Sequence, residues 1–511
     1  MTNKQKYAPW LVAAAALVVY LCFPTRNYYW DGIAFALDIE RVGRLSAELL
    51  HQNHLLYNVV GYLLYALARR AGFDVRAIEV LQILNGVLSA ACAFVLFHIL
   101  RRSLRSTYLS ACLSLLFAFS ATWWKFSTDA DSYVPATLLM LAAFHLLLPG
   151  REPRPLAVAL LHAGAMLLHQ LAVFFWPAAV AGLLLQASGR DARRRLRPAI
   201  IYTAAASLLT LAVYYLCFRL RTESLDPRAF VGWMASYSSG SGGFVFDFVS
   251  NLKYTLRGHV RLLWGGRFNL LRDYVNAPTV ALLALLIISA AALLVQAARH
   301  FRDTRLLSTP SIKNDATLRA VATLALVWMT PYLIFCFFFY PQDTFHRLVY
   351  LPAPVILVGV ALASVEPGRA RRYRLALFTA VLALSNFLFV VYPYSHVRPN
   401  TPLAMAYEMR ARWSPRTVVF YDFFNSDDAI LRYFNPPVRW QKPGAWEAGA
   451  LDEELRKVYQ SGGEAWVESS AVGRLTREPG GAEWLAARAR ETRELTDPAY
   501  TLKLVRVAPP E

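Results

Sequence analysis

Long apolar runs alternate with short polar or basic segments through the first four-fifths of the chain. A helix that crosses a bilayer needs about 20 predominantly apolar residues. The runs predict eleven such helices, over residues 9–23, 78–100, 108–122, 134–148, two within 155–186, 200–220, 278–298, 320–339, 351–365 and 375–391. This pattern is typical of a polytopic α-helical membrane protein.

The apolar stretch 155–186 is too long for one ordinary span, and His169 with Gln170 interrupts it near its midpoint. We predict two short, tilted helices that meet at an outer turn, with a single long helix as the alternative. Two helices place the arginine run of residues 190–197 on the cytoplasmic side, which agrees with the positive-inside bias.

Orientation follows from the basic residues. Lys4 and Lys6 precede the first helix, so we expect a cytoplasmic N-terminus and two large outer loops, at residues 25–76 and 221–276. The apolar segment 55–68 is short for a span, and we interpret it as an amphipathic helix along the outer interface. We expect the protein in the plasma (inner) membrane.

The tail changes character at residue 393, where charged and apolar residues begin to mix. TVVFYD and EAWVES are typical of strands, and SDDAILRYF and ALDEELRKVYQ of helices. We therefore predict a transmembrane domain over 1–392 and a small extracytoplasmic α/β domain over 393–511.

Composition argues against several other classes of protein. The chain has 511 residues, 56% of them hydrophobic, and a formal charge of +19. The tail from His396 onward carries 16 basic and 16 acidic residues, so the excess charge belongs to the membrane part, and we predict no nucleic-acid partner. The five cysteines lie in or beside apolar segments, which argues against a disulfide framework or a thiolate metal site.

Ionisable residues gather in four separate segments expected at the outer face. They are Asp31, the pair Asp129 and Asp131, His169, and the pair His346 and Arg347. Such groups near a membrane boundary indicate a shared polar cavity.

Each of these residues also has a structural interpretation. Asp31, Asp129 and Asp131 are placed to cap the helices that follow them. His169 is placed to satisfy two helix ends at a turn. Arg347 is placed to extend its side chain to lipid headgroups.

Five stretches hold the candidate residues in order: WDGIAFALDIE, HQNHLLYN, ADSYVPATLL, LLHQLAVFFWP and HRLVYLP. Together they resemble the glycosyltransferase C superfamily, in particular its protein O-mannosyltransferase-like branch. In that family an acidic residue just after the first helix precedes a His/Pro-rich segment and a re-entrant helix. The resemblance covers most of residues 1–365, and the tail matches only as an outward soluble domain.

The motifs carry over residue by residue. ADSYVPATLL looks like the family's Glu-x-Tyr motif, with Asp131 in place of Glu and Tyr133 matching. His169 matches a histidine before a short helix that ends in proline, and Arg347 matches the arginine of an Arg-x-x-x-x-Pro motif. The sequence departs from the family at HQNH, which replaces His-Pro-Pro-Gly.

The resemblance implies transfer of a sugar from a polyprenyl-phosphate donor to a hydroxyl of a protein, lipid or glycan. Such a reaction needs one base for the hydroxyl and cations for the leaving phosphate. We assign Asp31 as the base of a single inverting displacement. We predict no cofactor and no metal ion.

Arg347 is the expected phosphate ligand, because its guanidinium offers a planar fork of donors. Lys253, Arg257 and Arg261 of the second outer loop are further candidates, with headgroup contact as their alternative role. The residues expected to shape the acceptor side or to orient Asp31 are His54, Asp131, Tyr133, His169 and His346.

Two rival classes stay open. A transporter or flippase of lipid-linked sugars also gathers charge at a membrane cavity, although such proteins commonly contain internal repeats, and none is found here. The second rival class is a membrane scaffold whose tail binds partners.

Overall fold

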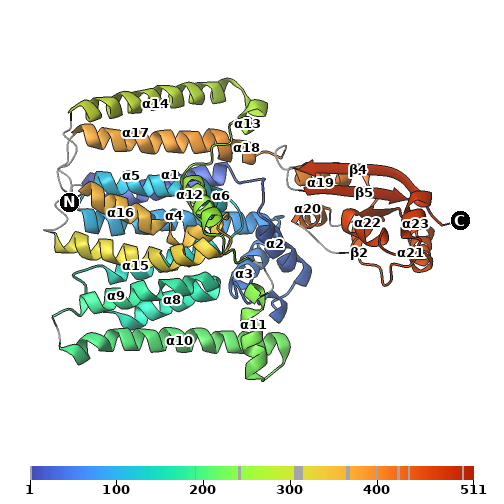
Figure 1. Ribbon diagram of the computed structural model, residues 1–511, viewed down its shortest axis with the longest axis horizontal. Helices are drawn as coiled ribbons and strands as arrows, with labels where there is room; N and C mark the ends of the chain where they lie inside the picture. Colours follow the sequence, from blue (N-terminus) through green and yellow to red (C-terminus); the bar gives the residue numbers. More distant parts are fainter. Residues whose placement is uncertain are drawn as a thin grey trace. The chain divides into compact units, whose positions relative to one another are not determined.

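A computed structural model describes residues 3–189, 191–239, 243–303, 315–363, 369–397, 401–422, 426–435, 438–497 and 500–510. The chain forms two compact units (Figure 1). The first contains residues 1–25 and 38–393, and the second contains residues 26–37 and 394–511.

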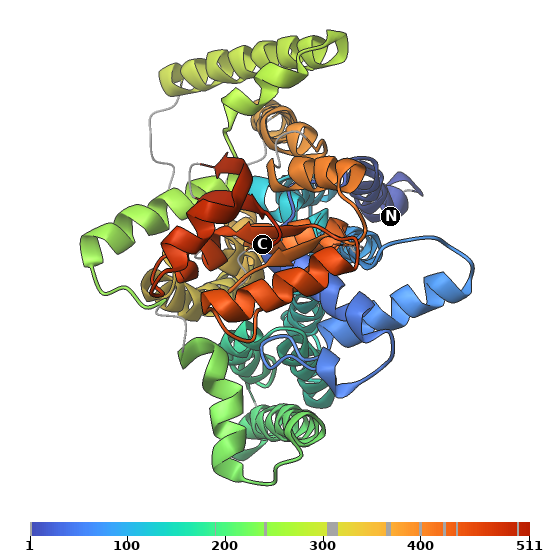
Figure 2. The same cartoon turned by 90° about the vertical axis from the view of Figure 1, so that its right-hand side faces the viewer.

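Helices of the first unit occupy all eleven ranges in which the apolar runs predict them. They are α1 (Asn3–Cys22), α4 (Ala77–Leu104), α5 (Thr107–Ala118), α7 (Tyr133–Leu147), α8 (Pro155–Leu168), α9 (Trp176–Gln186), α10 (Ala192–Thr222), α14 (Ala277–Asp303), α15 (Ala316–Phe338), α16 (Pro352–Ala363) and α17 (Arg369–Asn386). Most of the longer ones run in nearly one direction, horizontal in Figure 1 and end-on in Figure 2, whereas α14 is seen from the side in both views.

Within the described ranges, five helices are long and apolar enough to cross a membrane, or six if one bent pair counts as a span. Five further apolar helices are shorter. Length and composition therefore support a polytopic membrane protein, while the number of eleven spans stays a prediction.

The expected break at His169 is confirmed. α8 ends at Leu168, the 3₁₀ helix η2 (Gln170–Phe175) follows, and α9 begins at Trp176. The third predicted helix ends earlier than expected. α5 stops at Ala118, and α6 (Ala121–Ser127) leaves it at 68°, so the chain turns before residue 122.

Several shorter helices connect the long ones. The short helix predicted over residues 55–68 is present as α3 (Tyr57–Arg70). Its position along the outer membrane interface stays a prediction. α11 (Pro227–Ser239) and α12 (Phe248–Leu263) run across the direction of the long helices (Figures 1 and 2). The remaining connections are η1 (Ala47–Leu49), α13 (Phe268–Leu271), η3 (Arg272–Tyr274), the 3₁₀ helix η5 (Phe345–Tyr350), the π-helix η6 (Phe387–Val391) and α18 (Tyr392–Tyr394).

The second unit is built around a mixed five-stranded sheet with strand order β2-β1-β3-β5-β4. Parallel pairing joins β1 to β2 and β3, and antiparallel pairing joins β5 to β3 and β4. The strands are β1 (Val418–Phe420), β2 (Arg439–Gln441), β3 (Ala465–Glu468), β4 (Ala489–Asp497) and β5 (Tyr500–Val507). The helices are α19 (Thr401–Arg412), α20 (Ser426–Phe434), α21 (Ala448–Gln460), α22 (Ser469–Leu475) and α23 (Gly481–Arg488). The two strands and two helices predicted in the tail are thus confirmed.

Candidate active site

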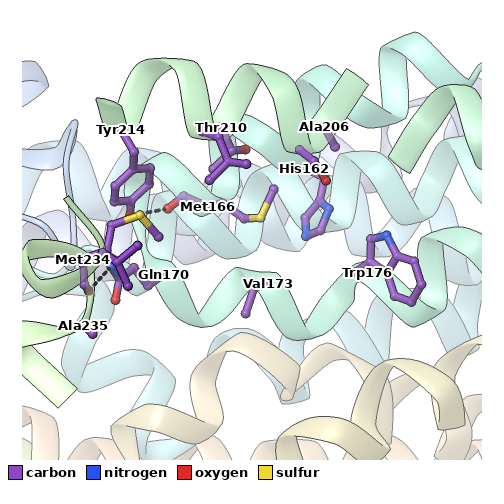
Figure 3. A pocket seen from close by; sticks show the side chains of 13 residues that line it. His162, Met166, Gln170, Val173, Trp176, Ala206, Thr210, Tyr214, Met234 and Ala235 are labelled. Carbon is purple, nitrogen blue, oxygen red and sulfur yellow. Dashed lines mark hydrogen bonds between the residues drawn. The ribbon is translucent and has the colours of Figure 1, made fainter. Parts of the chain in front are cut away.

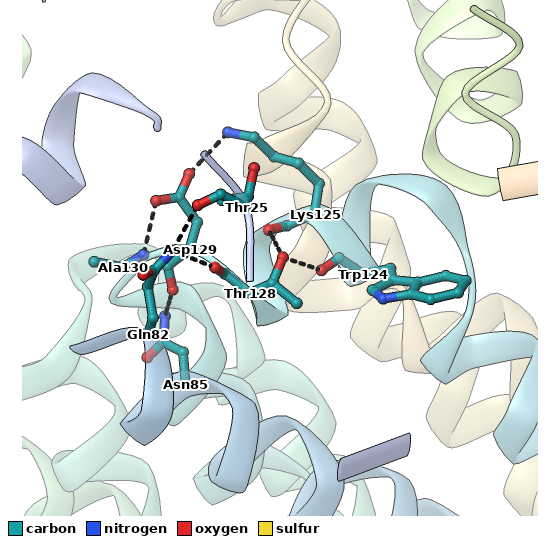
Figure 4. Close-up of polar contacts among 8 residues, drawn as sticks. All are labelled: Thr25, Gln82, Asn85, Trp124, Lys125, Thr128, Asp129 and Ala130. Atoms are coloured by element: carbon teal, nitrogen blue, oxygen red, sulfur yellow. Dashed lines mark hydrogen bonds and ion pairs between the residues drawn. The ribbon is translucent and has the colours of Figure 1, made fainter. Parts of the chain in front are cut away.

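The connection between α6 and α7 is a buried, hydrogen-bonded loop. Asn85 of α4 donates from its side-chain amide to the backbone carbonyls of Asp129 and Asp131, at 3.0 and 2.9 Å. Gln82, one turn earlier, donates to the carbonyls of Thr25 and Thr128, both at 2.8 Å (Figure 4). Because buried backbone carbonyls need partners, these two amides fix the loop on which both predicted aspartates stand.

Asp129 and Asp131 have different partners. The Asp129 carboxylate is fully buried and forms a 2.9 Å ion pair with Lys125 of α6 (Figure 4). An Asp131 carboxylate oxygen accepts the backbone N–H of Tyr133 at 2.6 Å. Asp131 thus satisfies the start of α7, which is the structural role that the sequence offered for it.

Lys125 is a candidate residue that sequence reasoning missed. Its side chain is only 16% exposed. The signal in the sequence is a lysine inside the aromatic stretch WWKF, just before the acidic pair. Asp129 is four residues further along the chain, just past the end of α6, so the ion pair closes over the end of that helix.

A row of aromatic and imidazole rings joins four predicted site residues. Tyr133 stacks on His169 with ring centroids 4.0 Å apart, and its hydroxyl lies 2.7 Å from Nδ1 of His346. On the other side, the rings of His169 and His54 lie 6.4 Å apart. His51 stacks on His54 at 4.2 Å. Segments far apart in the sequence therefore meet in one cluster of the first unit.

Backbone hydrogen bonds lock this cluster together. The N–H of Gln170 donates to the carbonyl of Asn53 at 3.0 Å, and the N–H of Leu56 donates to Leu167 at 3.0 Å. The break between α8 and η2 is thus paired with the HQNH segment. Nδ1 of His169 accepts the N–H of Leu171 at 3.1 Å, so His169 also satisfies a helix end.

Burial keeps these imidazoles neutral. It lowers the pKa of His169 to about 3, with the nearby His346 and His51 adding to the effect. It likewise lowers the pKa of His346 to about 3, with the charge of Arg347 as the second cause. At neutral pH both side chains therefore act as hydrogen-bonding groups and not as cations.

Arg347, on η5, is a fully buried cation. Its Nη1 donates to the backbone carbonyl of Asp343, and Nη2 donates to that of Pro341 at 2.9 Å. Within the described ranges, no carboxylate lies within ion-pair distance of this guanidinium, and Nε makes no hydrogen bond. The interpretation of Arg347 as a headgroup-seeking surface residue is wrong, because the protein itself encloses it.

The helix α12 lies against this guanidinium. Gly258 is placed so that a Cβ atom there would be 2.9 Å from Cζ of Arg347. The next residue, His259, accepts or donates a 3.0 Å hydrogen bond with the hydroxyl of Tyr350, the last residue of η5. The predicted cations Lys253, Arg257 and Arg261 are exposed on the same helix. Two of the regions predicted to bind phosphate are therefore neighbours.

Asp31 belongs to the other unit. It lies half-buried in the first turn of α2 (Trp30–Val42), in the part of that helix that clusters with the second unit. Nearby, Tyr28 stacks on Phe434 of α20 with centroids 5.5 Å apart. The ring cluster and Arg347 belong to the first unit. Contacts among predicted site residues are therefore described only between residues of the first unit, and Asp31 is not one of them.

The fold and its apolar helices support an integral membrane protein. Its helical unit encloses Arg347, a buried cation with no carboxylate partner among the described residues. The fold is similar to that of ArnT from Cupriavidus metallidurans bound to undecaprenyl phosphate, with a TM-score of 0.59, 12% identity and 99% of each chain covered. The apo state of that protein matches with a TM-score of 0.58, 13% identity and 97% of each chain. The fold that the resemblance to the glycosyltransferase C superfamily implied is thereby confirmed.

A weaker likeness concerns the predicted branch. The Saccharomyces cerevisiae protein O-mannosyltransferase Pmt1-Pmt2 complex bound to the sugar donor matches with a TM-score of 0.35 and 16% identity, over 44% of this chain and 35% of that one. At this score the likeness supports no argument, so the O-mannosyltransferase-like branch stays a prediction. No family model matches the chain, and no curated protein matches it significantly.

Proposed function

We propose that this protein is a membrane glycosyltransferase that moves a sugar from a polyprenyl-phosphate donor to a hydroxyl acceptor. Arg347 carries the proposal. A buried guanidinium without a carboxylate partner is costly, because a charge removed from water needs compensation. A phosphate oxygen supplied by a substrate would give that compensation, and Nε, which makes no hydrogen bond to the described residues, is one N–H donor available for it.

The neighbourhood of Arg347 supports a phosphate. Gly258 has no side chain, so the backbone of α12 can pack directly against the guanidinium. The exposed cations of α12, Lys253, Arg257 and Arg261, add positive charge on the same helix. Several cations around one anion stabilise negative charge as it develops on a leaving group. The solved ArnT structure of the same fold has undecaprenyl phosphate bound, which agrees with this class of ligand.

The reaction is a single displacement with inversion. The acceptor oxygen forms a bond to the anomeric carbon of the sugar while the bond from that carbon to the phosphate oxygen breaks. The hydroxyl proton passes to Asp31, the proposed base, and the products are the glycosylated acceptor and polyprenyl phosphate. The neutral row of His54, His169 and His346 with Tyr133 orients groups on the acceptor side.

Orientation completes the proposal. The N-terminus lies in the cytoplasm, the protein spans the plasma (inner) membrane, and the tail domain faces outward. Transfer then takes place at the extracytoplasmic face and serves glycosylation of the cell envelope. Lys4 and Lys6 before the first helix and the basic loops between later helices support this orientation.

The test uses detergent-purified protein and radiolabelled polyprenyl-phosphate sugars. Wild type is compared with Arg347→Gln and Asp31→Asn, and Asp38→Asn on the same helix α2 serves as the matched control. We expect release or transfer of label by wild type and Asp38→Asn, and its loss in the other two. Thermal unfolding of each variant shows whether the protein is intact.

The outcomes separate the classes. Equal turnover in Asp31→Asn would remove Asp31 as the base. Label that crosses a proteoliposome membrane without being cleaved from its lipid would identify a flippase instead. No cleavage of any donor by the intact wild type would overturn the transferase proposal.

A further inference from the structure

An elongated apolar groove of about 480 Å³ lies in the first unit between α8, η2, α10 and α11. Its walls include Met166, Val173, Trp176, Ala206, Thr210 and Met234 (Figure 3). Along α10 the lining extends from residue 206 to residue 214, which is about 12 Å at the rise of an α-helix. The groove thus has the shape and lining of a site for a hydrocarbon chain.

Part of the groove is bordered by exposed apolar side chains. Val173, Trp176 and Leu211 line it and are 49%, 42% and 48% exposed. The polar atoms of His162, at one end, are already occupied, with Nδ1 at 2.6 Å from the Tyr202 hydroxyl and Nε2 at 2.8 Å from the Ala172 carbonyl. Because α9 and α10 are apolar and α10 is long enough to cross a membrane, this opening suits a chain that enters from the bilayer.

The opposite end is polar and adjoins the ring cluster. Gln170 and Tyr214 lie there together with Met234 (Figure 3). The Tyr214 hydroxyl donates to the carbonyl of Gln52 at 3.0 Å, and Gln170 follows His169 directly. A molecule whose chain fills the groove would therefore present its head beside the HQNH segment.

We propose that this groove binds the acyl chain of a lipid acceptor, so that the acceptor hydroxyl belongs to a lipid. This inference rests on the proposed transferase function. The donor phosphate is assigned to Arg347 and α12, and no described residue of α12 or η5 lines the groove. Gln170 of the groove follows His169, which stacks on Tyr133, and the Tyr133 hydroxyl bonds His346, the residue before Arg347. The ring cluster that we assign to the acceptor side therefore links the groove to the proposed phosphate ligand.

The first test locates lipid chains by photolabelling and does not depend on turnover. Purified protein in nanodiscs is exposed to a palmitoyl glycerolipid with a diazirine in its acyl chain or to undecaprenyl phosphate with a diazirine in its prenyl chain. We expect the acyl probe to label peptides of η2 or α10. Thr210→Trp, which fills the groove, should remove that label, and Leu208→Trp should retain it because Leu208 is 69% exposed and outside the lining.

The second test compares two fates of the sugar. Transfer to chloroform-extractable product and hydrolysis of the donor by water are measured in proteoliposomes of host-membrane lipid extract. For Thr210→Trp we expect the ratio of transfer to hydrolysis to fall about tenfold, which corresponds to about 1.4 kcal/mol. Leu208→Trp should keep the wild-type ratio.

Three results would overturn the inference. One is labelling of the groove by the prenyl probe, which would assign it to the donor. Another is acyl labelling that both tryptophan variants retain. The third is label that appears on protein and not in the lipid extract. If wild type cleaves no donor but the acyl probe still labels the groove, the transferase proposal fails and the groove remains a lipid site without an acceptor role.

Discussion

Gly258 of α12 packs directly on the guanidinium of Arg347, and a Cβ at residue 258 would lie 2.9 Å from Cζ and 3.0 Å from Nη1. No unstrained carbon contact is that short, so a side chain at residue 258 displaces the guanidinium. The guanidinium is held by two backbone carbonyls, those of Pro341 and Asp343, and cannot move without losing a hydrogen bond. Because residue 258 has no side chain, the guanidinium of Arg347 can occupy this position.

We predict that Gly258→Ala lowers kcat/KM for the polyprenyl-phosphate donor by about tenfold or more, because a hydrogen bond from a charged group contributes about 1.5–3 kcal/mol. Steady-state kinetics over a range of donor concentrations measures the effect. Gly232→Ala on α11 is the matched control, since a Cβ there meets nothing within 4 Å. Equal losses in both variants would show that helix flexibility matters and contact with Arg347 does not.

The exposed cations of α12 give a second prediction. We expect Lys253→Ala, Arg257→Ala and Arg261→Ala each to raise KM for the donor several-fold and to weaken its dependence on salt, because exposed charges are screened by ions. Initial rates at low and high ionic strength test this. Arg228→Ala, an exposed arginine of the same outer loop, should leave both quantities unchanged. A salt dependence that survives all three substitutions would contradict this role for the exposed cations of α12.

Sequence patterns predicted the helical fold because the period and length of apolar runs report burial in a membrane directly. The pattern of ionisable residues predicted that His169 and His346 lie near one another, and the resemblance added His54 and Tyr133. The ring contacts show that all four are close together. Sequence patterns missed the partner of Arg347. Gly258 has no side chain to attract notice, and its role follows from a helix crossing that no local pattern encodes.

The missed Lys125 has another cause. A lysine in an aromatic stretch reads as an interfacial residue, and its ion pair depends on where the buried loop places Asp129. The short bent helix α6 was equally hidden, because the apolar run continues across the bend at residues 119–120. Hydrophobicity marks which residues are buried and does not mark where a helix turns.

The neutral buried histidines predict that acid destabilises the protein. The pKa of His169 and of His346 is about 3 in the folded state, below the value of about 6.5 in an unfolded chain. Between pH 6.5 and 3 the unfolded state binds more protons, so stability is complete above pH 6.5 and falls as the pH falls. We expect a loss of up to about 2 kcal/mol per histidine between pH 6.5 and 5.

Thermal unfolding in detergent at pH 7.5, 6.5, 5.5 and 5.0 measures this dependence. His346→Asn should flatten the curve, because an amide does not titrate in this range. A melting temperature that rises on acidification in wild type would contradict the prediction. A slope that is the same in wild type and His346→Asn would show that other groups carry the acid sensitivity.

Asn85 supports the loop that carries both buried aspartates, and its removal should destabilise the first unit. Its amide serves the carbonyls of Asp129 and Asp131, and its oxygen accepts the Tyr57 hydroxyl at 3.3 Å. Asn85→Ala leaves three buried polar groups without this partner, at a cost of about 1–3 kcal/mol for each group that stays unpaired.

We therefore expect Asn85→Ala to lower the melting temperature by several degrees and to reduce donor turnover, as measured by thermal unfolding and the transfer assay. Ser89→Ala is the matched control one turn further along α4. Ser89 is also fully buried, but its hydroxyl has no hydrogen-bond partner among the described residues. Its loss should cost little, because no bond is broken. Equal destabilisation by the two variants would mean that packing of α4 dominates, and that the amide bridge does not hold the loop.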